Sequence, residues 1–536
     1  MAPHQVDPGA SRVAATATPW WRDAVVYQVY PRSWADSNGD GVGDLEGLRR
    51  QLSYLVWLGV DAIWLSPIYR SPMADNGYDV SDYCDIDPVF GTLEQFDRLI
   101  HDSHELGLRV MLDWVPNHTS NQHPWFIESR SSRTNPKRDW YFWRDGVGGA
   151  PPNNWLAAFG GSAWTWDAAT LQWYLHLFLP AQPDLNWANP SVQDAMLAVL
   201  RFWLDRGVDG FRADVIHLIG KDPRLLDQPA PLAHQDLVGV YQDPSTHAHL
   251  RRIRGVLDSY AGDRVMVGEV QLAPSLLAPY YGQNDELQLV FNFGLLRSGW
   301  DAALWATVIS AAALSNNSAY EWPAWALSNH DTSRQRSRYG GSIARARAAA
   351  VVLLTLRGTP FLFAGEELGL LDAEVAPERR VDPAGRDPAR APIPWDSSAS
   401  HGWGAEPWLP WPPEAPQRNV ATSRADPASI VHLYRRLLAT RRRSPALRRG
   451  NLEVIDVGSG ILGYDRSASS ATGRDVRRVL VNFGDAGATV HGDDGDWVLE
   501  LSSSPDVDVQ AWGGRLGPNE AVLLRPAAGQ SGEDHE

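Results

Sequence analysis

Cysteine and positive charge are both scarce in this chain of 536 residues. Cys84 is the one cysteine, so neither an internal disulfide nor a zinc site built from several thiolates can form. Lys and Arg number 48 against 64 Asp and Glu, which gives a net charge of −16. Nucleic acids and anionic membranes attract basic surfaces, so we expect neither as a partner and favour a neutral ligand.

Long apolar runs are absent as well. No stretch of 18 or more apolar residues occurs, so we expect no membrane-spanning segment. Residues 1–19 lack the basic start and apolar stretch of a signal peptide, so we expect a flexible tail there and a cytoplasmic protein. The polar end at 528–536 is predicted to be disordered. The length favours two or three domains, and we expect a monomer or a homodimer.

Apolar runs of strand length alternate with helix-like patterns through most of the chain. The predicted strands lie at 24–30, 62–68, 109–115, 210–216, 265–270, 287–293, 325–330 and 359–365. Helical patterns occupy 44–59, 92–107 and about 191–206. Continuous apolar strands are typical of parallel sheets that helices cover on both faces. Eight such units predict a (β/α)8 TIM barrel, with a doubly wound open sheet as the alternative.

Two regions break this repeat. About 70 residues rich in Trp, Pro, Gly and Asn follow the third strand, and we interpret 119–179 as a small inserted domain. After about residue 447 the pattern changes to short strands with turns, which predicts a C-terminal antiparallel β-sandwich domain over 447–527. The barrel would then comprise residues 20–118 and 180–446.

Carboxylates lie at or just past the ends of three predicted strands: Asp214 in GFRADV, Glu269 in VMVGEV and Asp331 in ALSNHD. Barrel enzymes carry their active groups at these strand ends. Arg212 lies two residues before Asp214 on the same strand face and would keep that carboxylate ionised. The apolar strand before Glu269 favours a protonated acid. One ionised and one protonated carboxyl group suit glycoside cleavage. A buried ion pair and helix caps are the structural alternatives.

The ordered motifs NGYDV, VPNHT, QPDLNW, GFRADV, GEV and NHD resemble those of the α-amylase superfamily, glycoside hydrolase family 13. Within it the chain is similar to the α-glucosidase and oligo-1,6-glucosidase branch, from about residue 20 to 525. The resemblance implies that Asp214 is the nucleophile, Glu269 the acid/base and Asp331 the transition-state stabiliser. It also implies a −1 subsite lined by Asp79, His118, Arg212 and His330.

The segment GRDPARAPIPW resembles a family segment in which an arginine pairs with the aspartate at the Asp79 position and closes the pocket. We favour Arg390 for this role, with Arg386 as the alternative. Ala391 and Ile393 depart from the usual Thr and Met. A closed pocket implies exo-acting release of glucose from short α-glucosides. The family resemblance implies retention of the anomeric configuration through a covalent glucosyl intermediate.

The resemblance leaves linkage and reaction outcome open. Val215 after the expected nucleophile matches relatives active on α-1,6 bonds, whereas DVIHLIGKD resembles α-glucosidases that cleave α-1,4 bonds. We favour maltose-type α-1,4 substrates, with α-1,6 as the alternative. A transglucosylase or sugar isomerase on the same scaffold is the second hypothesis. A non-catalytic binding protein is the third, and it conflicts with the presence of all three carboxylates.

The loop DSNGDGVGD carries oxygen-bearing side chains at alternate positions, as in an EF-hand loop. The expected ligands are Asp36, Asn38, Asp40, the Val42 carbonyl and Asp44. Gly47 stands where the bidentate Glu of an EF-hand would be. We expect a structural Ca²⁺ or Mg²⁺ and no organic cofactor, and similar loops bind such a metal in the branch. An ordinary Asx-turn loop is the alternative.

Overall fold

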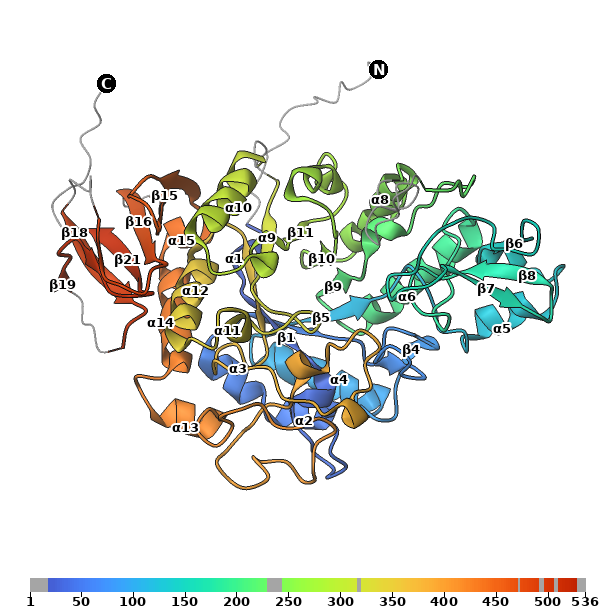
Figure 1. The fold of residues 1–536 in the computed structure, drawn as a ribbon, viewed down its shortest axis with the longest axis horizontal. Coiled ribbons are helices and arrows are strands. Elements are labelled where there is room, and N and C mark those ends of the chain that lie inside the picture. Colours follow the sequence, from blue (N-terminus) through green and yellow to red (C-terminus); the bar gives the residue numbers. More distant parts are fainter. Residues whose placement is uncertain are drawn as a thin grey trace, which may run out of the picture.

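A computed structural model describes residues 18–228, 243–315, 320–470, 473–490, 496–505 and 510–527. The tails expected at 1–19 and 528–536 therefore lie outside the described residues, apart from positions 18 and 19. Figure 1 shows a central barrel with one smaller β-rich part on each side of it. Among the described residues, no helix is both long enough and apolar enough to cross a membrane.

Eight parallel strands close into a barrel in the order β1-β13-β12-β11-β10-β9-β5-β2. Their bounds are β1 Val26–Val29, β2 Ala62–Leu65, β5 Arg109–Trp114, β9 Gly210–Ala213, β10 Val265–Gly268, β11 Leu289–Asn292, β12 Pro323–Ala326 and β13 Thr359–Phe363. The closed order confirms the predicted TIM barrel and excludes the open sheet. β12 ends four residues earlier than predicted, so Asn329 and His330 belong to the loop that follows it.

Helices surround the barrel. The longer ones are α4 Leu93–Glu105, α6 Pro190–Asp205, α8 Ser245–Asp258, α10 Ala302–Ser315, α12 Ile343–Thr355 and α14 Ile430–Arg443. Short helices are α1 Trp20–Asp23, α9 Gly294–Arg297, α11 Gln335–Arg338, α13 Val420–Ala425 and α15 Pro445–Arg449. The single helix predicted over 44–59 is two, α2 Leu45–Arg50 and α3 Leu52–Leu58, because Gln51 has a non-helical backbone. Helix α4 begins with a capping box formed by Thr92 and Gln95.

The segment after β5 forms a small unit beside the barrel. It contains α5 Pro124–Ser131 and a three-stranded sheet ordered β6-β8-β7, with β6 Trp143–Arg144, β7 Trp164–Asp167 and β8 Gln172–Leu175. A two-stranded sheet, β3 Tyr69–Arg70 and β4 Asp82–Ile86, precedes β5. In Figure 1 the three-stranded sheet lies at the opposite end of the molecule from the C-terminal strands.

The C-terminal region is an antiparallel sheet ordered β14-β15-β16-β21-β18-β19, with a separate pair β17-β20. The strands are β14 Asn451–Ile455, β15 Ile461–Ser470, β16 Gly473–Asn482, β17 Ala488–Thr489, β18 Trp497–Ser502, β19 Gln510–Ala511, β20 Arg515–Leu516 and β21 Ala521–Pro526. This confirms the predicted C-terminal antiparallel β-domain.

Helix α12 joins the two parts. All of its residues from Ala346 to Thr355 are buried, as expected for a helix packed on every side. It contacts α14 on one side and β21 and β16 of the C-terminal sheet on another. The hydroxyl groups of Thr355 and Tyr464 in β15 lie 2.6 Å apart at this contact. The barrel and the C-terminal sheet therefore share one continuous core.

Asp209 forms hydrogen bonds at the amino-terminal ends of three barrel strands, β5, β9 and β10. Its buried carboxylate accepts from Arg109 at 3.0 Å, Arg264 at 2.9 Å and His104 at 2.7 Å, and from the Val110 N–H at 2.9 Å. Burial alone would raise the pKa of Asp209, but His104, the backbone N–H and Arg109 outweigh it and lower that pKa. Its backbone also bonds to β5 and to the first residue of β10.

Replacing Asp209 with Ala leaves several cations around a buried position without their carboxylate. We expect the free energy of unfolding to fall by about 3 kcal/mol, at the low end for a broken buried pair because the cations reach solvent. Urea unfolding followed by circular dichroism measures this. Asp97→Ala, which removes an exposed pair with Arg206, is the matched control and should cost under about 1 kcal/mol. Equal losses in the two variants would contradict the role assigned to Asp209.

Candidate active site

A pocket of about 250 Å³ opens at the carboxyl ends of the barrel strands. Its lining includes Asp75, Tyr78, His118, Phe159, Phe178, Asp214, Val215, Glu269, Gln271, Asp331 and Arg386. Asp214 directly follows β9, Glu269 directly follows β10, and Asp331 lies in the loop after β12. The barrel thus brings together the carboxylates that the sequence analysis singled out. Phe159 and Phe178 come from the inserted segment and cover the pocket from that side.

Arg212 lies buried beneath the pocket floor, which Asp214 and Glu269 form, and is not itself among the lining residues. One of its guanidinium nitrogens donates to Asp113 and to Asp214, each at 2.7 Å, and the other donates to Glu269. Its side chain is only 3% exposed. The link to Glu269 was not anticipated, because the sequence places no cation beside that residue. One guanidinium therefore fixes the mutual positions of Asp214 and Glu269.

The turn after β9 adds a second link between these carboxylates. Val215 adopts a left-handed backbone with φ of 36°, which is unusual for a β-branched residue. In this conformation its N–H donates to Glu269 Oε2 at 3.1 Å. The same turn leaves Asp214 directed into the pocket, among the lining residues. Backbone strain of this kind is typical of functional sites.

Crowding of carboxylates changes their acidity. Burial raises the pKa of Asp214 well above the usual range, Glu269 and Asp113 add to that rise, and Arg212 opposes it. Burial likewise raises the pKa of Asp113 to about 6, against Arg212 and the Tyr78 hydroxyl. Closely spaced carboxylates titrate as a set rather than singly. The pocket floor therefore holds a proton more readily than isolated aspartates would.

His330 connects the barrel interior to the pocket. The Gln28 amide N–H donates to His330 Nδ1 at 2.7 Å, so Nε2 carries the ring proton and lies 2.6 Å from the Tyr78 hydroxyl. Tyr78 in turn donates to Asp113 at 3.0 Å. Burial lowers the pKa of His330 to about 3, so the ring is neutral near pH 7. Sequence reasoning did not identify Gln28 or Tyr78.

His118 also lines the pocket, as the resemblance implied. Its Nε2 lies 3.2 Å from the Tyr78 carbonyl, and Asn117 donates to its Nδ1 at 3.3 Å. Burial lowers the pKa of His118 to about 4. Its ring centroid is 5.2 Å from that of Phe178. The neutral imidazole is thus held against the wall formed by the inserted segment.

Asp79 does not reach the pocket, contrary to our expectation. Its buried carboxylate accepts from the Ser71 hydroxyl and from the backbone N–H groups of Ala74 and Asp75, each at 2.9 Å. These bonds close the turn that carries Asp75 to the pocket. Asp75 and Asp79 lie four residues apart in one motif, and sequence alone did not show which of them faces a ligand.

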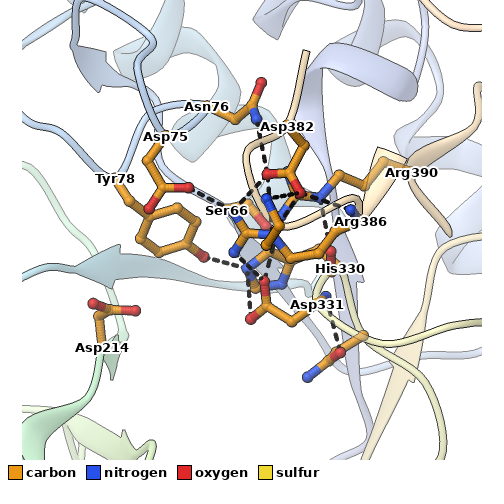
Figure 2. Close-up of polar contacts among 12 residues, drawn as sticks. Ser66, Asp75, Asn76, Tyr78, Asp214, His330, Asp331, Asp382, Arg386 and Arg390 are labelled. Carbon is orange, nitrogen blue, oxygen red and sulfur yellow. Dashed lines mark hydrogen bonds and ion pairs between the residues drawn. The ribbon is translucent and has the colours of Figure 1, made fainter. Parts of the chain in front are cut away.

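Arg386, the alternative to Arg390, forms the bridge at the pocket rim (Figure 2). It donates to Asp75 at 2.5 Å and to Asp331 at 2.9 Å. Arg390 is fully buried behind it, donates to the His330 carbonyl at 2.7 Å and reaches Asp331 at 3.3 Å. Arg390 is absent from the pocket lining, so it supports the rim from behind.

Asp382 ties the two arginines together. It accepts from Arg386 Nη2 at 2.6 Å and from Arg390 Nη1 at 3.2 Å, and its side chain is fully buried. Burial alone would raise the pKa of Asp331, but His330, Arg386 and Arg390 hold it well below the usual range. Asp331 is therefore a permanent anion beside Asp214. No pattern in the sequence marks Asp382, because its partners come from the loop around it.

Comparison with known proteins identifies this site. The family model for the α-amylase catalytic domain matches residues 28–450. A probable α-glucosidase of Rhizobium meliloti is 44% identical over 503 residues, which cover 88% of this chain and 90% of that protein. The chain belongs to glycoside hydrolase family 13.

Other relatives of this family 13 enzyme carry three different names. An oligo-1,6-glucosidase of Parageobacillus thermoglucosidasius is 39% identical, with 81% of this chain and 86% of that protein covered. The crystal structure of XgtA, an α-glucosyl transfer enzyme, is 42% identical with a TM-score of 0.89, over 95% of this chain and 100% of that one. Trehalulose synthase MutB of Pseudomonas mesoacidophila has a TM-score of 0.87 at 35% identity over the same shares. The chain is thus a glycoside hydrolase of the α-glucosidase and oligo-1,6-glucosidase branch.

The loop at 36–44 of this family 13 enzyme lies outside the pocket. Asp36 accepts the Gly41 N–H at 3.0 Å, Asp40 accepts the Val42 N–H at 2.8 Å, and Asp44 caps α2 through Gly47 at 2.7 Å. Within the described ranges no group of three or more His, Cys, Asp or Glu is arranged to hold a metal. The carboxylate and amide oxygens are still of the type that Ca²⁺ or Mg²⁺ takes, so the metal site stays a prediction.

If the loop binds a divalent cation, saturating Ca²⁺ should stabilise the folded protein. At a Ca²⁺ concentration 100 times the dissociation constant, the free energy of unfolding would rise by about 2.7 kcal/mol. The protein treated with EDTA should therefore melt at a lower temperature than the same protein after Ca²⁺ is added back. Asp40→Ala should abolish this response. A melting temperature that is unchanged by EDTA and by Ca²⁺ would refute the site.

Proposed function

We propose that the protein is a retaining, exo-acting α-glucosidase that releases glucose from the non-reducing end of short α-glucosides. The observation that carries this proposal is the arrangement of Asp214 and Glu269 on one guanidinium. Two carboxylates held by the same group lie close together, which suits the short separation of roughly 5–5.5 Å in retaining enzymes rather than the wider gap of inverting ones.

In the first step Asp214 attacks the anomeric carbon while the bond to the leaving oxygen breaks. Glu269 transfers its proton to that oxygen, and the leaving sugar departs with it. In the second step Glu269 takes a proton from water, the resulting hydroxide attacks the anomeric carbon, and the bond to Asp214 breaks. Two inversions give net retention of the α-configuration.

Asp331 and Arg212 contribute electrostatically to this mechanism. The oxocarbenium-like transition state is positive, so a nearby permanent anion such as Asp331 stabilises it. Arg212 compensates the negative charge of the floor and holds Asp214 towards the anomeric carbon. Neutral His118 lines the pocket without adding charge, and neutral His330 orients the Tyr78 hydroxyl, which also lines it.

Pocket size supports exo action. Its 250 Å³ is below the roughly 300–1,000 Å³ of pockets that take larger ligands, so it suits one sugar ring. The Arg386–Asp75 pair bridges the rim, which would stop a chain from continuing past the terminal unit. We propose Asp75, in place of Asp79, as the aspartate that helps bind the terminal glucose.

For linkage we propose maltose-type α-1,4 substrates first and α-1,6 substrates second. Relatives named α-glucosidase and oligo-1,6-glucosidase both lie within 37–44% identity, which supports both linkages. Glucosyl transfer is the second candidate reaction, since XgtA, named for that reaction, is 42% identical to this chain. In a transfer reaction a sugar hydroxyl replaces water in the second step, with the same residues.

The test is product analysis after separate incubation with maltose, isomaltose and sucrose. We expect free glucose from maltose, with an initial excess of the α-anomer over its equilibrium share by proton NMR, because retention releases the non-reducing glucose as the α-anomer. Glu269→Gln should lower turnover by roughly 10²–10⁴-fold, because a Gln side chain cannot transfer the proton. Glu105→Gln, at an exposed position of α4, is the control and should leave turnover unchanged.

New di- or trisaccharides in excess of glucose would favour the transglucosylase instead. An initial excess of β-glucose over its equilibrium share would contradict the double displacement. No turnover of any of the three sugars would contradict the proposed substrate class.

The pH profile tests the state of the pocket floor. Asp214 must be ionised to attack, so activity falls as pH drops through its raised pKa. We expect the ascending limb of kcat/KM to lie above the ordinary aspartate value of about 4. Asp113→Asn removes a neighbouring charge that adds to the rise, and should move this limb to lower pH. An ascending limb at or below pH 4 in the unmodified enzyme would contradict the crowding argument.

A further inference from the structure

We infer that Gln271, anchored by Arg297, is a positioning residue that controls the proton on Glu269. This inference rests on the function proposed above, in which Glu269 is the acid/base. It assigns to two residues at the pocket mouth a role in selecting which leaving groups receive a proton.

The two oxygens of Glu269 have different partners. Oε2 accepts from Arg212 Nη2 and from the Val215 N–H, and both donors are buried. Oε1 accepts from Gln271 Nε2 at 2.7 Å. Glu269 is only 2% exposed, whereas Gln271 is exposed and lines the pocket. Oε1 is therefore the oxygen that faces the mouth, where a leaving group would sit.

Arg297 decides which way the Gln271 amide points. The last residue of α9, it donates to Gln271 Oε1 at 3.2 Å. A guanidinium only donates, so the amide must present its oxygen to Arg297 and its NH₂ group to Glu269. These two hydrogen bonds form a relay from the exposed guanidinium of Arg297, through the Gln271 amide, to the Glu269 carboxyl group.

This orientation has a chemical consequence. Two donors already occupy Oε2, so the proton that Glu269 transfers must be carried on Oε1. The Gln271 N–H competes with that proton, because an amide donor bonds to a carboxylate oxygen and not to a hydroxyl hydrogen. The relay thus favours the carboxylate form, which the second step needs, and it fixes the direction from which Oε1 meets the leaving oxygen.

Several other groups act on Glu269 and stay in place when the relay is changed. Arg212 lies on β9, Asp214 lies in the turn after β9, and Asp113 lies on β5. His217 lies in the 3-10 helix Ile216–Leu218, and its Nδ1 is 3.3 Å from the Glu269 carbonyl oxygen. Asp331 lies across the pocket and acts on Asp214. A change in the pH profile of a relay variant can therefore be assigned to Gln271 or Arg297.

The experiment compares Gln271→Met, Arg297→Met and the unmodified enzyme on maltose and on p-nitrophenyl α-glucoside. A sugar leaving group needs the proton of Glu269, whereas p-nitrophenolate leaves almost without it. At a pH below the descending limb, Glu269 is protonated in both enzymes, and loss of Gln271 leaves Oε1 without its fixed direction. We therefore expect kcat/KM for maltose to fall about tenfold there in Gln271→Met, with less than about a threefold change for the aryl glucoside. The descending limb of kcat/KM against pH should move to higher pH. Arg297→Met should give smaller changes in the same directions.

Gln283→Met is the matched control, at an exposed glutamine that does not line the pocket. Equal effects on both substrates, or an unmoved descending limb, would overturn the inference. A raised KM for maltose with unchanged kcat and pH profile would also overturn it, since Gln271 would then only bind the leaving sugar. If the unmodified enzyme turns over neither substrate, the proposed function fails first. Because Arg297 is exposed, its variant keeps the test open even if Gln271→Met folds poorly.

Discussion

The site depends on the ion pairs that Arg212 forms with three carboxylates. A single guanidinium, buried under the pocket, contacts Asp113, Asp214 and Glu269 from three adjacent strands of the barrel. Without a cation these carboxylates could not share so small a space, because burial and mutual repulsion would force protons onto them. With it, the barrel keeps two reactive carboxyl groups at a fixed separation, and their chemistry follows from that geometry.

The rim of the pocket has a different balance of charge, with arginines close to each aspartate. There two arginines are placed among three aspartates, so that Asp331 remains an anion although it lies beside other negative groups. Figure 2 shows Asp382 within this cluster, next to Arg386 and Arg390, and it orients both guanidinium groups. Floor and rim thus use the same residue types with different balance. At the floor, burial and crowding keep the pKa values of Asp214 and Asp113 raised although Arg212 opposes the rise, whereas at the rim the arginines keep the pKa of Asp331 low.

The fold was predictable because its strands are continuous apolar runs in a regular alternation with helices. Asp214, Glu269 and Asp331 were predictable for the same reason, since each follows such a run. The remaining site residues depend on loops that meet only in three dimensions. Asp75 was missed because Asp79 stands in the same motif, and only the turn geometry shows which one is used for structure. Gln28 and Asp382 have no sequence signal, because their partners lie far away or within an irregular loop.

The shared helix α12 sets how this enzyme can be divided. A segment that is buried on every side cannot end a domain, because whichever part kept it would expose an apolar helix to water. The C-terminal sheet is therefore not a removable appendage in spite of its separate topology. Truncation at the apparent boundary near residue 450 would uncover the face of α12 that packs on β21 and β16, so the barrel and the sheet form one structural unit.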